Sequence, residues 1–173
     1  RDRTDPVFAD RTSPLGFVGP KRYTRHVVDY ASLPPIHYVV ISHNHYDHLD
    51  REATRVLLAQ PSPPRYIVPL GIKSWLEGQD ERLTGGNVVE LDWGERVTHG
   101  GVAFDAYPSQ HWSARSFSDR FETLWASWRI EIGQFSVWFA GDTGYNARLF
   151  DELGKKMPPC LLYTSDAADD RLS

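Results

Sequence analysis

Hydrophobic and polar positions along the chain follow strand spacing in some segments and helix spacing in others. Residues 37–42 form a β-branched and aromatic run that predicts a buried strand. Asp50 fits the N-cap of a helix that Pro61 ends, whereas residues 1–36 are rich in Pro and Gly and predict an extended, loop-rich segment. Further strands are expected at 65–69, 87–92, 102–107, 123–132 and 135–140, with a hairpin turn at 133–134, and further helices at 71–78 and 146–157. This order predicts one mixed α/β domain.

Composition narrows the class of protein. Hydrophobic residues make up 40% of the 173 positions and charged residues 24%, which is typical of a globular domain. The apolar runs are too short to span a bilayer, and a net charge of −4 without a basic stripe argues against a nucleic-acid partner. One cysteine, Cys160, allows neither an internal disulfide nor a thiolate zinc cluster. We therefore expect a cytoplasmic protein whose chemistry comes from His, Asp and Glu.

The two ends of the chain differ in character from the middle. The chain opens without Met on charged residues, and its composition changes to an acidic segment after Pro159. We expect residues 1–157 to be part of a domain that is incomplete at both ends. Residues 158–173 are expected to be a non-native or disordered tail.

The strongest chemical signal is an H-x-H-x-D-H cluster between the strand at 37–42 and the helix that follows it. His43, His45, Asp47 and His48 place four metal-capable side chains within six positions. Neutral imidazoles and a carboxylate are good ligands for an ion such as zinc. The alternative is a polar loop whose histidines hydrogen-bond one another, but such a cluster would repel itself once protonated. The spacing therefore predicts a metal site.

Two later residues become candidate site residues once this cluster is considered. His111 follows the strand at 102–107, and Asp142 follows the strand at 135–140. Taken alone, His111 is typical of an ordinary loop histidine and Asp142 of an Asx turn. Both nevertheless lie beyond the carboxyl end of a predicted strand, where α/β sheets place their sites.

Together these motifs resemble the metallo-β-lactamase superfamily, and in particular its N-acylphosphatidylethanolamine-hydrolysing phospholipase D branch. The resemblance covers residues 4–157 and implies a hydrolase domain with an αββα sandwich fold and two zinc ions. It is carried by Asp5-Pro6-Val7-Phe8, Gly19-Pro20-Lys21-Arg22, Ser42 to Asp50, Pro108-Ser109-Gln110-His111-Trp112, Leu124-Trp125-Ala126-Ser127-Trp128 and Phe139-Ala140-Gly141-Asp142-Thr143-Gly144-Tyr145.

The resemblance also assigns the ligands. By position, the first zinc would be held by His43, His45 and His111. The second would be held by Asp47 and His48, with Asp142 bridging both ions. The family's last histidine ligand would follow beyond the end of this chain, so the second site is expected to be incomplete here and to bind its ion weakly.

The implied activity is that of a zinc-dependent phosphodiesterase acting on N-acylphosphatidylethanolamine-like lipids, with peripheral membrane contact. The resemblance does not specify an oligomeric state. A metal-bridging hydroxide would attack phosphorus, and Asp47 would orient it and shuttle its proton. Tyr46 and Trp112 are expected to contact the substrate. Asp5 is expected to support the metal ligands from behind.

Other interpretations stay open at this point. The same scaffold could hydrolyse another ester, a lactone or a cyclic phosphodiester. Asp142-Thr143-Gly144 also occurs in aspartic proteases, which need a second such motif and would leave the histidines unexplained. A non-catalytic metal-binding module would have every coordination position filled by protein. We expect three further histidines to be surface or structural residues: His26, His37 and His99. Trp125 and Trp128 are expected to be core aromatics.

Overall fold

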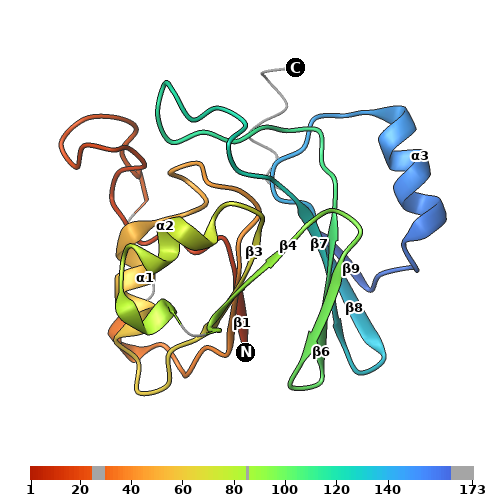
Figure 1. The fold of residues 1–173 in the computed structure, drawn as a ribbon, viewed down its shortest axis with the longest axis horizontal. Coiled ribbons are helices and arrows are strands. Elements are labelled where there is room, and N and C mark those ends of the chain that lie inside the picture. The colour runs from red at the N-terminus through yellow and green to blue at the C-terminus, as the bar shows by residue number, and fades with distance from the viewer. Residues whose placement is uncertain (25–29, 85, 165–173) are drawn as a thin grey trace.

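The protein consists of two stacked β-sheets with helices on both outer faces (Figure 1). The structure, a computed structural model, describes residues 1–24, 30–84 and 86–164. In Figure 1 the layers run from α1 and α2 through the first sheet and the second sheet to α3. This order confirms the expected αββα arrangement.

The first sheet is parallel and has the order β1-β2-β3-β4. Its strands are β1 (Asp2–Thr4), β2 (Tyr38–Val40), β3 (Arg65–Pro69) and β4 (Val88–Leu91). Alternate side chains of β2 face opposite sides of the sheet: Val39 packs toward the helices, whereas Tyr38 and Val40 pack toward the second sheet. A strand buried on both faces explains why residues 38–41 form an unbroken hydrophobic run.

Helices α1 (Arg51–Leu58) and α2 (Lys73–Glu77) cover the outer face of this sheet. The Asp50 side chain accepts hydrogen bonds from the backbone N–H groups of Glu52 and Ala53, so it is the N-cap that the sequence predicts. Two 3-10 turns, η1 (Tyr30–Ser32) and η2 (Glu81–Leu83), complete this layer.

The second sheet has the order β5-β6-β7-β8-β9. It contains β5 (Arg96–His99), β6 (Val102–Tyr107), β7 (Ser127–Ile132), β8 (Phe135–Phe139) and β9 (Leu162–Thr164). Its pairs are antiparallel except β8 with β9, and Ile132 pairs with Phe135 across the expected hairpin. Helix α3 (Ala147–Lys156) confirms the helix predicted at 146–157, and Asn146 is its N-cap.

The two sheets enclose an apolar core that also fixes the strand leading to the histidine cluster. Phe104 and Trp128 are fully buried there. The indole Nε1 of Trp128 donates a hydrogen bond to the carbonyl oxygen of Ile41 at 2.9 Å. Because Ile41 lies two residues before His43, this bond ties the second sheet to the site segment. Trp128 is therefore a core residue, as expected.

Strands β1, β5 and β7 differ from the sequence prediction. The residue pattern predicts no strand within residues 1–36, where β1 lies, and none in the polar segment that forms β5. Strand β7 starts at Ser127 rather than at residue 123. The reason is that the N–H groups of Leu124 and Ala126 donate to Leu70 and Ser42, outside the second sheet.

The segment after residue 157 contains an ordered strand. β9 pairs with β8, and Ala140 N–H donates to the Thr164 carbonyl at 2.7 Å. For residues 162–164 this pairing replaces the expected disorder, because it supplies hydrogen-bond partners to the backbone of β8 at the sheet edge. Residues 165–173 and His26 lie outside the described residues. Within the described parts of the chain, no helix has the length and apolar character needed to cross a bilayer.

Candidate metal centre

The histidine cluster lies in a tight turn directly after β2. Ile41 N–H still bonds to Ile67 of β3, and the chain then turns so that Leu49 N–H reaches the His45 carbonyl at 2.8 Å. His43 and His48 are buried by this turn, whereas Asp47 lies on its outer side with 60% of its side chain exposed.

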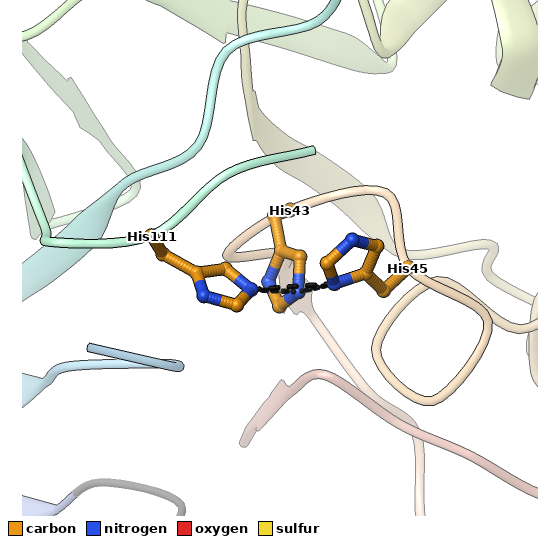
Figure 2. Close-up of side chains that lie close together, drawn as sticks. All are labelled: His43, His45 and His111. Atoms are coloured by element: carbon orange, nitrogen blue, oxygen red, sulfur yellow. Dashed lines mark hydrogen bonds between the residues drawn. The ribbon is translucent and has the colours of Figure 1, made fainter. Parts of the chain in front are cut away.

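Three histidine rings converge at this point from two distant segments (Figure 2). His43 Nε2 lies 2.7 Å from His45 Nδ1 and 3.0 Å from His111 Nε2. His111 Nε2 and His45 Nδ1 are 3.2 Å apart. A tetrahedral ion with bonds of about 2.0–2.1 Å separates its nitrogen ligands by about 3.3 Å. The three nitrogens are thus close to the spacing of a three-histidine metal site.

The electrostatics keep these imidazoles neutral. Burial and the neighbouring His48 lower the pKa of His43 well below its ordinary value, and burial together with His111 lowers the pKa of His45 to about 4. Burial also lowers the pKa of His111. Because only a neutral imidazole nitrogen can bind a metal, His43, His45 and His111 keep their donor atoms available near neutral pH.

A second set of groups adjoins the three histidines. His48 Nε2 lies 3.2 Å from Asp142 Oδ2 and 3.9 Å from Asp47 Oδ2. Asp142 Oδ2 is also 3.9 Å from His43 Nε2 and 3.7 Å from His111 Nε2. The Asp142 carboxylate therefore lies between the two sets, where a ligand shared by two ions would have to be.

Asp142 and His48 form a tightly coupled ion pair. Burial disfavours the charge on both, but the hydrogen bonds of His48 to Asp142 and Asp5 raise its pKa to about 11. The same contact with His48 holds the pKa of Asp142 below its ordinary value despite burial. The other oxygen of Asp142, Oδ1, is buried without a partner among the described residues. A buried, unpaired carboxylate oxygen beside three neutral histidines is the environment that a divalent cation would complete.

Asp5 lies behind His48 rather than among the converging nitrogens. Its Oδ2 is 2.6 Å from His48 Nδ1, and its Oδ1 accepts the Ser42 N–H at 2.7 Å. Asp5 could form a second three-residue ligand group with His43 and His48. Because Nδ1 faces Asp5, however, His48 directs Nε2 at Asp142 and Asp47, so the geometry favours Asp5 as the group that orients the imidazole.

The two expected substrate residues both adjoin His45, one in space and one in the chain. The Trp112 ring packs edge-on against His45 with 4.4 Å between ring centroids. Tyr46 follows His45 in the turn, and its hydroxyl donates to the Arg115 carbonyl at 2.9 Å. A role in substrate binding stays a prediction for both. His99 bonds instead to Tyr38, the first residue of β2, at the opposite end of that strand from the site.

The sequence did not single out Ser42 or Arg115, which the structure brings to the site. The Ser42 hydroxyl lies between the Asp5 carboxylate and His43 Nδ1, the latter at 2.8 Å. The place of Ser42 directly before His43 could have indicated this contact. No pattern marks Arg115, because its contacts with the ligand loop are with residues more than 60 positions away.

Comparisons with known proteins agree with this geometry. A family model described as a beta-lactamase superfamily domain matches residues 4–172. N-acyl-phosphatidylethanolamine-hydrolyzing phospholipase D 1 of Caenorhabditis elegans is 38% identical over 161 residues, which are 90% of this chain and 45% of that protein. The mitochondrial N-acyl-phosphatidylethanolamine-hydrolyzing phospholipase D of Saccharomyces cerevisiae is 37% identical over 154 residues, 85% of this chain and 31% of that protein. The chain thus spans less than half the length of these curated relatives.

A solved structure shares the fold. CmlA, a diiron beta-hydroxylase from Streptomyces venezuelae, superposes with a TM-score of 0.62 and 25% identity over 92% of this chain and 30% of that one. The similarity supports the αββα architecture. The metal named for CmlA is iron, so the fold by itself does not select zinc.

Proposed function

Because the chain belongs to the metallo-β-lactamase superfamily, in its N-acylphosphatidylethanolamine-hydrolysing phospholipase D-like branch, we propose that it carries the catalytic centre of a zinc-dependent phosphodiesterase of phospholipase D type. The proposed substrate is an N-acylphosphatidylethanolamine-like lipid. The observation that carries the proposal is the convergence of His43, His45 and His111 on one point, with Asp142 between them and His48.

The proposed ligand sets follow from these contacts. The three converging nitrogens of His43, His45 and His111 would hold one ion. His48 Nε2 and Asp47 would hold the other, and Asp142 would be shared. When bound, two such ions supply Lewis acidity and lower the pKa of water toward neutrality.

The chain's own residues would order the reaction. Asp142 is buried and would fix the spacing of the two ligand sets, whereas Asp47 keeps 60% of its side chain exposed and can face an incoming substrate. Asp47 would accept the proton that water loses when the water oxygen bonds to phosphorus. The bond from phosphorus to the ethanolamine oxygen then breaks, and Asp47 returns the proton to that oxygen. The products are phosphatidic acid and an N-acylethanolamine.

Hydrolysis of N-acylphosphatidylethanolamine and of a simple aryl phosphodiester, before and after chelation, tests the proposal. We expect turnover that disappears with chelator and returns with zinc. The His111→Ala variant should be inactive, whereas His99→Ala, which changes a histidine at the other end of β2, should keep wild-type turnover. Phosphodiester turnover that survives chelation, or turnover of lactones alone, would contradict the proposal. Restoration by iron or manganese but not by zinc would contradict the assignment of zinc.

A further inference from the structure

The loop that carries His43, His45 and His48 is joined to the segment that carries His111 by one arginine. Arg115 lies four residues after His111, and its Nη1 donates to the carbonyl oxygens of Asn44 and Leu49, both at 2.7 Å. Asn44 directly follows His43 and Leu49 directly follows His48, so the two carbonyls flank the segment that carries His45 and His48. One guanidinium nitrogen thus holds both ends of the turn.

Tyr46 adds two further contacts between the ligand loop and Arg115, one through its ring and one through its hydroxyl. The Arg115 guanidinium lies 4.1 Å from the centroid of the Tyr46 ring and 4.6 Å from that of Trp75 in α2. The Tyr46 hydroxyl in turn donates to the Arg115 carbonyl at 2.9 Å. Hydrogen bonds therefore run from the arginine to the ligand loop and from the ligand loop back to the arginine.

The main chain of Arg115 is itself fixed. The Asp119 carboxylate accepts the N–H groups of Arg115, at 2.9 Å, and of Ser116, at 2.7 Å. Phe121 N–H donates to the Ser113 carbonyl at 2.9 Å and closes the loop at its base. The guanidinium is thus presented from a hydrogen-bonded loop rather than from a free surface segment.

The guanidinium is also half withdrawn from water. Burial is the main cause that lowers the pKa of Arg115, and no salt bridge to a carboxylate is found for its guanidinium in the described parts of the chain. The Arg115 guanidinium stacks on two rings and donates to two main-chain carbonyls, so it holds the backbone of the ligand loop in place.

We propose that Arg115 is a positioning residue that holds the His43–His48 loop against the His111 segment at the spacing the metal ligands need. His43 and His45 come from one of these segments and His111 from the other, so a change in their separation moves the three donor nitrogens apart. The inference rests on the proposed metal site. It assigns Arg115 no contact with the substrate.

Binding of Co²⁺ to the full chain tests this role without any substrate. In Arg115→Met the stem is kept and every donor is lost, so we expect Co²⁺ to bind at least about tenfold more weakly, a loss typical of groups that support metal ligands. We also expect a changed visible spectrum, because the absorption of Co²⁺ depends on the number and geometry of its ligands. Arg115→Lys keeps a cation but lacks the planar face that stacks on both rings, so it should restore part of the affinity.

Arg82→Met is the matched control. Arg82 also donates from Nη1 to a main-chain carbonyl, that of Leu58 at 2.6 Å, but it lies at the far end of α1 from the ligand loop. Its loss should leave the affinity for Co²⁺ and the spectrum at their wild-type values even where the unfolding midpoint falls.

Three outcomes would overturn the inference. The first is wild-type affinity with an unchanged spectrum in Arg115→Met, even in a less stable protein. The second is the same result in Arg115→Lys if only that variant folds. The third is a wild-type chain that binds no Co²⁺, which would remove the proposed site as well. A chain that binds Co²⁺ and responds to Arg115→Met but does not hydrolyse the lipid would support the positioning role and refute the proposed function.

Discussion

His48 Nδ1 lies 2.6 Å from Oδ2 of Asp5, although 43 residues separate the two in the chain. The contact exists because β1 pairs with β2 in parallel, so the residues that follow both strands meet at one edge of the sheet. Asp5 adopts a positive φ of 38° to reach this place, a conformation that Asp tolerates better than most residues. Backbone strain of this kind clusters at functional sites.

Asp5→Asn should weaken metal binding by the second ligand set. The Asp5 carboxylate accepts from Ser42 N–H, the Ser42 hydroxyl and His48 Nδ1, so an amide NH₂ would have to face one of these donors. Loss of such a supporting partner costs about 10–100-fold in metal affinity. Competition with a chelator measures the change. Asp92→Asn, which alters an exposed carboxylate bonded to Trp93 N–H, should bind as wild type does, and an equal affinity in both variants would refute the role of Asp5.

Gly141→Ala should separate Asp142 from His48. Gly141 has a φ of 60°, and an added Cβ would lie 2.5 Å from Ser42 Cβ and 2.8 Å from Ser42 Oγ. Either Ser42 or the Asp142 turn must move, so we expect a loss of the more weakly bound metal together with reduced stability. Gly133→Ala is a close match, with the same φ of 60° but open space around its Cβ.

In Gly133→Ala only the left-handed backbone conformation lowers the stability, by about 1–2 kcal/mol. Metal content after dialysis and urea unfolding, measured on both variants, separate the two effects. Full metal content in Gly141→Ala would mean that the turn carrying Asp142 can shift without consequence for the site.

Asp47→Asn should lower turnover more than metal content. The amide keeps the size of the side chain and one oxygen ligand but loses the charge that accepts a proton. We expect a loss of about 10²- to 10⁴-fold in kcat, the usual contribution of a general base. Glu52→Gln, at another exposed carboxylate near the start of the next helix, should keep full turnover. If Asp47→Asn is fully active with normal metal content, Asp47 serves only as a ligand.

Asp119→Asn should destabilise the metal-free protein at pH 7 but not at strongly acid pH. Burial raises the pKa of Asp119, but the N–H groups of Ser116 and Arg115 outweigh it and lower the pKa below its ordinary value of 3.8. A carboxylate with a lowered pKa adds stability above the unfolded value, and this stability is lost as the pH falls through the folded value.

The difference from wild type should therefore be at most about 1 kcal/mol at pH 7, since solvent screens a surface carboxylate, and should vanish well below pH 3.8. Urea unfolding with chelator present, at pH 7 and at acid pH, measures it. Asp151→Asn, in an exposed pair with Lys155 on α3, is the control at both pH values. A difference that persists at acid pH would show that the carboxylate charge is not what holds the loop.

The amino-acid sequence alone determined the elements that have a clear local pattern and the chemistry of the cluster. Strand β3 (Arg65–Pro69) and the Asp50 cap of α1 follow from local periodicity and capping, which depend on neighbours in the chain. The H-x-H-x-D-H spacing places its own donors together because they share one turn. These features need no distant partner, and that is why the sequence predicts them.

The tertiary structure decided which distant residues complete the site. Strand β1 and the place of Asp5 depend on a parallel pairing across more than 30 residues, which leaves no periodic trace in three residues of sequence. Arg115 lies in an irregular loop, and its role follows only from the fold that brings Asn44 and Leu49 within reach of one nitrogen. Local spacing specifies which side chains can bind a metal, whereas long-range packing specifies where those side chains are held, because the contacts that hold them join segments that the sequence keeps far apart.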